Sequence, residues 1–292
     1  MAERLFAAFA LLLGVWQLEA QLVKFDHDQM LKYTAKSPFE RFPDGRPKVP
    51  DDILEKMKAL SAEDVYGVLM GKGFRNQYEG NWQVLHPGRK LVGRAFTVQF
   101  MPVRNDVMSL DDAEAKAKGL AAGSNQRAID MLQAGDVVVV DLNGKYEESS
   151  FVGDNLAHYI MRMTGTGMVI DGGIRDLEGI AGMDMSAYFR GVHPGVNRVS
   201  MLTGINVPVR IGNVTVMPGD VVLGDREGVY FIPPEFAKEV VDKAEETRIH
   251  DEWTKMKFDM KKYKSSEVYG RPTRPELIKE YEEYLKSRLG KK

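Results

Sequence analysis

The sequence predicts a mixed α/β fold, and three patterns between about residues 51 and 250 support that prediction. Helical stretches alternate with short β-rich runs along this part of the chain. The run 137–140 is uniformly apolar, whereas a half-exposed strand alternates, so we expect a central strand with both faces covered. The later runs lie close together between Gly-containing turns, which indicates hairpins or a small barrel-like sheet.

Local patterns place the individual elements. Two Ser-x-x-Asp spacings, Ser61 to Asp64 and Ser109 to Asp112, are capping-box signals that open helices. A further helix is expected after the proline pair at 233 and 234, since proline fits the first helical turn. We expect strands over 93–100, 136–141, 168–171, 207–211 and 220–223, and another helix over 156–163.

The chain divides into a signal, a lead-in, a body and an extension. An apolar run over residues 5–16 is typical of an export signal, here residues 1–20, so we expect an exported protein, periplasmic or secreted. A buried N-terminal helix or an uncleaved anchor is the alternative. The run is shorter than the roughly 20 residues that cross a bilayer, so no permanent membrane span is expected. Four prolines predict an extended lead-in over 21–50, and the body covers 51–250.

The segment 251–292 is a charged C-terminal extension with 12 Lys or Arg and 8 Asp or Glu. After Pro275, apolar residues at helical spacing predict an amphipathic helix that packs on the body or on a neighbouring subunit. A basic arm for nucleic acid is the alternative. Over the whole chain, 40 Lys and Arg against 42 Asp and Glu give a net charge of −2, so we expect small-molecule or protein partners and no nucleic acid.

Two Gly-rich strand ends are the places where chemistry is expected. One leads into the helix over 156–163, and its free amides could hold a carboxylate or phosphate. The other ends in Arg175 and Asp176, a cation for an acidic substrate and a carboxylate that suits a hard metal such as Mg²⁺. A helix cap and a surface ion pair are the structural alternatives. The residues at the first of these ends are Gly153, Asp154, Asn155, Leu156 and Ala157.

Several other kinds of site are excluded or weakened. The chain has no cysteine, which excludes disulfides, thiolate zinc sites and thiol nucleophiles. The five His residues form no His-x-x-x-His pair, and neither a Walker loop nor a Gly-x-Ser-x-Gly elbow occurs. His193 could line a pocket, but a loop histidine that caps a turn is the favoured interpretation.

A set of sequence blocks, in order, resembles a known family over roughly residues 51–250. The blocks cover 91–98, 134–141, 153–157, 167–176, 189–191 and 216–225. The family joins the regulator of ribonuclease activity A with the class II 4-hydroxy-4-methyl-2-oxoglutarate/4-carboxy-4-hydroxy-2-oxoadipate aldolases. The resemblance implies a swivelling-domain-like β/β/α sandwich that assembles as a homotrimer or a hexamer of two trimers, with active sites between subunits.

The resemblance also assigns roles to the site residues. The aldolases carry an Asp, then twenty residues, then Arg-Asp, and an acidic residue three positions later; Asp154, Arg175 and Asp176 match this spacing. The last position is Gly179, with Glu178 one residue early. By this pattern Asp176 would ligate Mg²⁺ or Mn²⁺ and Arg175 would bind a 2-oxo acid. The amides of residues 155–157 would hold its carboxylate, and Asp154 would orient a water on the metal or a substrate hydroxyl.

The resemblance therefore implies a divalent-metal-dependent lyase. It would cleave or decarboxylate a small 2-oxo acid through a pyruvate enolate, by retro-aldol cleavage or by decarboxylation of oxaloacetate. A non-catalytic protein-binding regulator that resembles the ribonuclease regulator is the alternative. A related family enzyme that acts on sugar acids or on another unassayed substrate is a third. Whether Glu178 takes the place of the acidic residue missing at Gly179 stays open.

Overall fold

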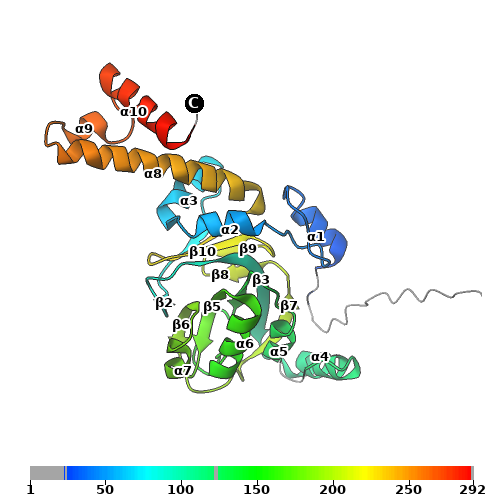
Figure 1. Ribbon diagram of the computed structural model, residues 1–292. Coiled ribbons are helices and arrows are strands. Elements are labelled where there is room, and N and C mark those ends of the chain that lie inside the picture. Colours follow the sequence, from blue (N-terminus) through cyan, green and yellow to red (C-terminus); the bar gives the residue numbers. More distant parts are fainter. Residues whose placement is uncertain (1–22, 24, 122–123, 291–292) are drawn as a thin grey trace, which may run out of the picture.

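The computed structural model describes residues 23, 25–121 and 124–290. Its central strands are β1 (Tyr78–Glu79), β2 (Gln83–Val84), β3 (Leu91–Pro102), β4 (Asp136–Asp141), β5 (Gly167–Ile174), β6 (Ser186–Val192), β7 (Ser200–Ile205), β10 (Val221–Gly224) and β11 (Val229–Ile232). They form a curved nine-stranded sheet of order β1-β11-β10-β3-β4-β5-β6-β2, and β7 also pairs with β3 (Figure 1). A separate hairpin contains β8 (Val209–Ile211) and β9 (Val214–Val216). The expected mixed α/β class, with a curled sheet, is confirmed.

Some helices pack on this sheet and others project from it (Figure 1). They are α1 (His27–Tyr33), α2 (Asp51–Met57), α3 (Ala62–Gly71), α4 (Asn105–Ala117), α5 (Ser124–Ile129), α6 (Asp154–Thr164), α7 (Leu177–Ala181), α8 (Ala237–Asp259), α9 (Ser265–Val268) and α10 (Pro275–Arg288). Ser61 caps α3 with the expected capping box, since its hydroxyl accepts from Asp64 N and its own amide donates to the Asp64 carboxylate. The five expected strands overlap β3, β4, β5, β8 and β10.

The second expected capping box is wrong. Helix α4 begins at Asn105, so Ser109 lies inside the helix instead of at its start. The Ser109 hydroxyl donates to the carbonyl of Asn105 at 2.6 Å, a bond that a serine inside a helix makes to the preceding turn. The spacing of Ser109 and Asp112 therefore belongs to a continuing helix and not to a helix start.

Strand β4 is central and buried on both faces, as the apolar run predicts. It lies parallel to β3 and β5, and residues 137–140 are fully buried. Val138 and Val140 pack in the cluster that includes α5, α6 and α7. Val137 and Val139 pack on the other side, against the β8–β9 hairpin. Two layers thus cover the parallel part of the sheet, and its strands end together at one edge.

A third layer covers the antiparallel part of the sheet. Helices α2, α3 and α8 contribute a core that closes over β10 and β11. The residues of these two strands that face it are Val221, Leu223, Tyr230 and Ile232. This layer lies away from the carboxyl ends of the parallel strands, so it supports the sheet without reaching the candidate site (Figure 1).

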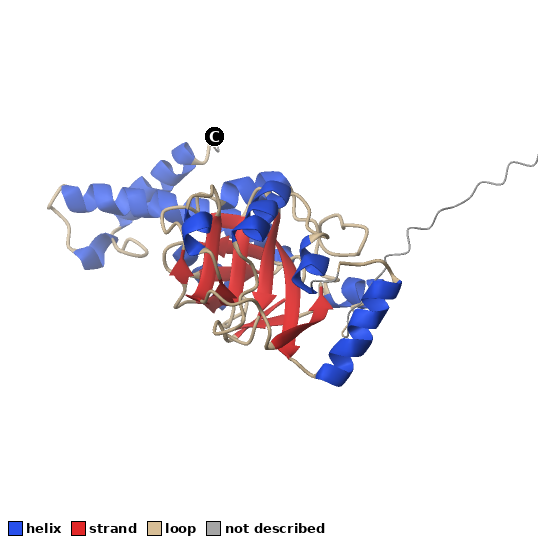
Figure 2. Ribbon diagram, turned by 90° about the horizontal axis from the view of Figure 1, so that it is seen from below, coloured by secondary structure: helices blue, strands red, loops and turns tan. Residues whose placement is uncertain are grey.

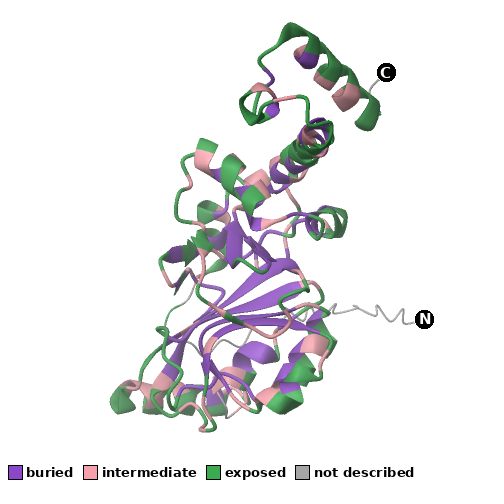
Figure 3. Cartoon of the chain, turned by 90° about the vertical axis from the view of Figure 1, so that its left-hand side faces the viewer, coloured by how far each residue is buried: buried purple, intermediate pink, exposed green. Residues whose placement is uncertain are grey.

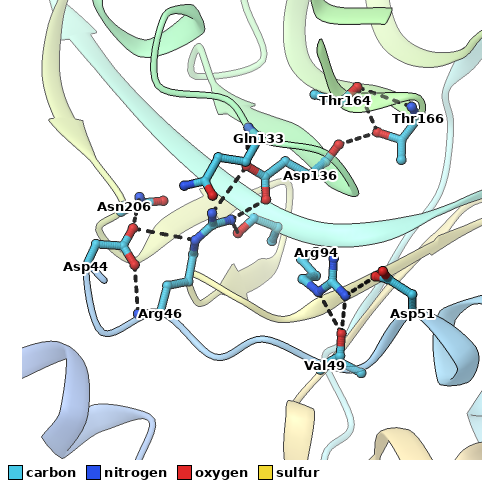
Figure 4. Close-up of polar contacts among 11 residues, drawn as sticks. Asp44, Arg46, Val49, Asp51, Arg94, Gln133, Asp136, Thr164, Thr166 and Asn206 are labelled. Atoms are coloured by element: carbon cyan, nitrogen blue, oxygen red, sulfur yellow. Dashed lines mark hydrogen bonds and ion pairs between the residues drawn. The ribbon is translucent and has the colours of Figure 1, made fainter. Parts of the chain in front are cut away.

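The lead-in is partly helical and is fastened to the sheet. It was expected to be extended, but α1 forms behind a capping box at Asp26. Arg46, in the segment that follows α1, is completely buried. The Arg46 guanidinium donates to both carboxylate oxygens of Asp136, at 2.6 and 3.2 Å (Figure 4). Arg94 donates to the carbonyl of Val49 at 2.7 Å. These contacts join the lead-in to β3 and to the first residue of β4.

The C-terminal extension forms an arm, which we define as residues 251–290. Helix α10 folds back onto α8, so the expected amphipathic helix packs on the chain's own helix. Trp253, Val268 and Leu277 form its small core. The arm stands away from the sheet (Figure 2), and most of its residues are exposed (Figure 3).

No helix in the described ranges is both long and apolar enough to cross a membrane. Residues 1–20, expected to be an export signal, lie outside the described residues. The expectation of export is therefore carried by the sequence alone.

The buried pair of Arg46 and Asp136 gives a first prediction. Arg46→Ala leaves a buried carboxylate without its partner and should lower the free energy of unfolding by about 3–5 kcal/mol, measured by urea unfolding. Lys48→Ala, at an exposed neighbour, is the control and should cost little. A double change, Arg46→Met with Asp136→Leu, should recover much of the loss because no charge is left buried. Equal unfolding midpoints for Arg46→Ala and Lys48→Ala would contradict the prediction.

Asp220 gives a second prediction, on pH. Burial raises the pKa of Asp220 to about 7 from an ordinary value of 3.8, against a smaller lowering effect of the hydrogen bond from Met217 N. Between these two values the folded chain holds a proton that the unfolded chain releases, so stability should fall as pH rises and level off above about 7. Asp220→Asn should abolish this decline and be more stable at pH 8 by a few kcal/mol, at about 1.4 kcal/mol per pKa unit.

Unfolding midpoints of the native chain and Asp220→Asn between pH 4 and 8 test this. Asp259→Asn, at an exposed carboxylate, should keep the native profile. If Asp220→Asn shows the same decline as the native chain, Asp220 does not hold the proton.

Candidate functional site

The candidate site forms where two segments meet beside the end of β5. Strands β4 and β5 are in parallel register up to Asp141 and Asp171. The chain then returns so that Phe151 N donates to Gly173 O at 2.9 Å and Arg175 N donates to Val152 O at 3.0 Å. These two bonds bring the start of α6 beside the residues that follow β5, although about twenty residues separate them in sequence.

Gly153 makes this approach possible. Its backbone is extended, at φ −106°, so conformation alone does not require glycine. A Cβ there would, however, collide with Oδ2 of Asp176 and lie 3.1 Å from the guanidinium carbon of Arg175. The absence of a side chain at Gly153 therefore leaves the space that the Arg175 and Asp176 side chains occupy.

Arg175 and Asp176 present their charged groups at the surface. Asp176 adopts a left-handed backbone with φ 56°, which is uncommon outside glycine, and it precedes α7 without capping it through its side chain. Its Oδ2 lies 3.4 Å from Arg175 Nη1, and the two side chains are 39% and 36% exposed. The cap alternative thus fails for Asp176, whereas the surface ion pair is present but open to a ligand.

Asp154 faces the position where the family pattern has an acidic residue. It is the first residue of α6, and its Oδ1 accepts from Asn155 N at 2.7 Å. A Cβ at Gly179 would lie 2.9 Å from Asp154 Cβ and 3.0 Å from its Oδ2. Gly179 therefore makes room for the Asp154 carboxylate. Glu178 is exposed and makes no hydrogen bond or ion pair with the described residues.

The amides at the start of α6 are less available than the sequence suggests. Ala157 N donates to Gly153 O at 3.0 Å, which is the first helical hydrogen bond. Asn155 N is turned to the Asp154 carboxylate. Of the three expected donors, Leu156 N is the one left for a ligand, with Asn155 N available only if it exchanges its acceptor.

A largely buried polar cluster around Arg190 joins β5, β6 and the β8–β9 turn. In the sequence, Arg190 lies in a family block and was assigned to no site. The Arg190 guanidinium donates to Asp171 Oδ1 at 2.7 Å and to Glu79 Oε1 at 2.8 Å. The other oxygens of these carboxylates accept hydrogen bonds from the backbone amides of the β8–β9 turn. Burial raises the pKa of the neighbouring Asp141, with a smaller contribution from Asp171. Because these groups hydrogen-bond to one another and to the hairpin, the cluster fixes the β8–β9 turn against the sheet.

His193 caps a turn, as favoured from the sequence. Its Nδ1 accepts from the amides of Gly195 and Glu148, at 3.0 and 3.3 Å. No pocket role is needed to account for its position.

The residues present fit a divalent ion held mainly by water and substrate. Within the described part of the chain, no three His, Asp or Glu side chains gather as a metal site. A magnesium-type site, however, needs only one or two protein carboxylates. Asp176 supplies one that is exposed, and the lack of a side chain at Gly153 leaves room for it.

The space above Gly153 gives a third prediction. Gly153→Ala should displace Asp176 and Arg175 and lower the free energy of unfolding by about 1–3 kcal/mol through overpacking. Gly67→Ala is the matched control, because a Cβ there meets nothing within 4 Å and alanine favours the helix α3. Urea unfolding measures both. Gly153→Ala as stable as the native chain, with Asp176 unmoved in a crystal structure, would contradict the prediction.

Comparisons with known proteins show the family and the fold of this chain. Protein DlpA of Legionella pneumophila is 31% identical over 170 residues, which are 58% of this chain and 25% of that protein. A protein of Halalkalibacterium halodurans named as a putative 4-hydroxy-4-methyl-2-oxoglutarate aldolase is 29% identical over 141 residues, 47% of this chain and 67% of that protein. The chain thus spans only about a quarter of DlpA.

Solved structures show the same fold. Streptomyces coelicolor RraAS2, described as an unusual member of the RNase ES inhibitor RraA protein family, has a TM-score of 0.63 at 28% identity and covers 72% of this chain with all of its own. An uncharacterized protein from Pseudomonas syringae has a TM-score of 0.63 at 24% identity and covers 79% of this chain. The RraA-like family profile, described as Aldolase/RraA, matches residues 52–231, more than half of the chain. The chain therefore belongs to the RraA-like family.

Proposed function

We propose that the protein is a divalent-metal-dependent lyase that acts on a small 2-oxo acid. The observation that carries the proposal is the convergence of Asp154, Arg175 and Asp176 at one open edge of the parallel sheet. Relatives named as putative aldolases support a lyase of this class. Both reactions proposed, retro-aldol cleavage and decarboxylation of oxaloacetate, pass through a pyruvate enolate.

Each site residue has a proposed task. Asp176 would hold Mg²⁺ or Mn²⁺, since its carboxylate is open at the surface. When bound, the ion withdraws charge from the keto oxygen and carboxylate of the substrate and so favours breaking of the neighbouring C–C bond. Arg175 would bind a substrate carboxylate through its planar guanidinium, helped by Leu156 N. Asp154 would accept a hydrogen bond from a water or a substrate hydroxyl.

Gly179 favours decarboxylation over retro-aldol cleavage. Retro-aldol cleavage must remove a proton from the substrate hydroxyl, whereas decarboxylation of oxaloacetate releases CO₂ without that step. In this chain an acidic side chain is absent at position 179, and Asp154 faces that position instead. Oxaloacetate is therefore the first substrate to assay.

We further propose that a second copy of the chain closes the site, as a homotrimer or a hexamer of two trimers. Arg175 and Asp176 are open in the single chain. Apolar side chains are exposed nearby, and Val192 pairs with the residue that directly precedes Arg175. Tyr146, Val192 and Val196 are 41%, 38% and 44% exposed. Such a group of exposed apolar side chains is typical of a subunit interface.

The fourth prediction tests the chemistry. With Mg²⁺ or Mn²⁺, Asp176→Asn should release pyruvate from oxaloacetate on the order of 100-fold more slowly than the native chain, a loss of about 2.7 kcal/mol in transition-state stabilisation. Glu178→Gln is the control, and its rate should stay within about twofold because Glu178 is exposed and makes no hydrogen bond or ion pair with the described residues. A coupled lactate dehydrogenase assay, corrected for the metal-only rate, measures pyruvate. The lyase proposal is lost if neither oxaloacetate nor any hydroxy-oxo-diacid yields pyruvate above that rate.

The second candidate is a non-catalytic protein-binding regulator. The acidic residue missing at Gly179 favours it, as does the likeness to RraAS2. It predicts capture of a ribonuclease with no pyruvate release. Export, which we retain as a proposal, argues against a cytosolic partner, and a mature N-terminus at Gln21, found by mass spectrometry, would support export.

A further inference from the structure

The end of the arm concentrates positive charge in a chain whose net charge is −2. We define the arm tip as residues 255–274, from the last turns of α8 through α9 to the residue before α10. This segment contains seven Lys or Arg and two acidic residues. The arm tip therefore differs in charge from the rest of the protein.

Most of these cations are free to meet a partner. Lys257 is buried against Glu280, and Arg274 pairs with Glu267. The other cations are exposed, and none of them forms a salt bridge with a described residue. They are Lys255, Lys261, Lys262, Lys264 and Arg271.

Large apolar side chains are exposed among the same cations. Met256, Met260 and Tyr269 are 44%, 57% and 74% exposed. Basic side chains interleaved with exposed apolar ones are the composition of protein surfaces that bind at the interface of an anionic membrane.

The arm holds this surface firmly and away from the body. Trp253, Val268 and Leu277 are almost fully buried between the arm helices. Thr254 hydroxyl contacts the carbonyl of Val268, and His250 Nε2 lies 2.6 Å from the carbonyl of Gly270. The arm stands clear of the sheet in two views (Figures 1 and 3). A flat partner can thus approach the tip without meeting the body.

We propose that the arm tip docks the protein peripherally on an anionic phospholipid membrane. Each Lys or Arg near such a surface adds attraction, and the Met and Tyr side chains can enter the headgroup layer. Single-stranded nucleic acid is the other polyanion to consider, but it is bound in grooves and by stacking aromatic rings, and two of the three exposed apolar side chains are methionines. The family match ends at residue 231, so this surface lies outside the part that the family shares.

The fifth prediction concerns vesicle binding by the full chain. Native protein should sediment with phosphatidylcholine vesicles that contain phosphatidylglycerol, and not with pure phosphatidylcholine, and added salt should release it. The triple variant Lys261→Gln, Lys262→Gln, Lys264→Gln should bind on the order of 100-fold more weakly, because each cation contributes about fivefold. The double variant Met260→Ser, Tyr269→Ser should also bind more weakly but keep the salt dependence.

A matched control distinguishes the effect of the arm-tip cations from the effect of lowering the total positive charge. Lys56→Gln, Lys116→Gln, Lys286→Gln removes the same charge from exposed sites elsewhere and should change binding by less than about threefold. All variants keep residues 1–22, so any contribution from that segment cancels. The proposal is overturned if anionic vesicles do not bind, if the tip triple behaves like the control triple, or if polyuridylate binds while vesicles do not. Unfolding midpoints equal to the native value show that the variants are folded.

Discussion

Strand β4 has no polar face, and the rest of the structure depends on that constraint. Residues 137–140 need cover on both sides, which α5 to α7 give on one face and the β8–β9 hairpin on the other. The crossover from β4 to β5 must then return beside β5, and its bonds to Gly173 and Arg175 fix where α6 starts. The site is thus a consequence of how the parallel strands are packed, because the same register that buries the valines aligns the strand ends.

Patterns that depend on neighbours in sequence could be predicted. The apolar run of β4, the capping box at Ser61 and the glycines at strand ends each have a local physical cause, and they led to Asp154, Arg175 and Asp176. Ser109 shows the limit, because the same spacing occurs inside a helix that began four residues earlier. Ala157 shows another limit, since whether its amide is free depends on where the first helical hydrogen bond closes.

Contacts between distant residues could not be predicted. Arg46 lies in a Pro- and Gly-rich stretch that is typical of a surface loop. It is nevertheless fully buried, because its guanidinium pairs with the carboxylate of Asp136, which is 90 residues away in sequence. Burying the two charges has a desolvation cost, and their mutual attraction offsets it only at close distance. The main effect of the pair is therefore to fix the position of the lead-in, and its net contribution to the free energy of folding is small. Gly179 is a second example. From the sequence it is only a position that lacks the acidic residue of the family pattern, whereas the structure shows that it makes room for the Asp154 side chain.

Net charge is a poor guide to partners when charge is unevenly placed. The balance of 40 basic and 42 acidic residues argues against a polyanion partner for the whole chain, but the arm tip holds seven of those basic residues against two acidic ones. Screening confines electrostatic attraction to about 10 Å, so a partner at the tip meets the local charge and little of the total. The same reasoning separates the candidate site from the tip. Under the two proposals, Arg175 would bind a small anion at the end of β5 and the lysines of the arm tip would act on a membrane, so the two groups would not compete for one ligand.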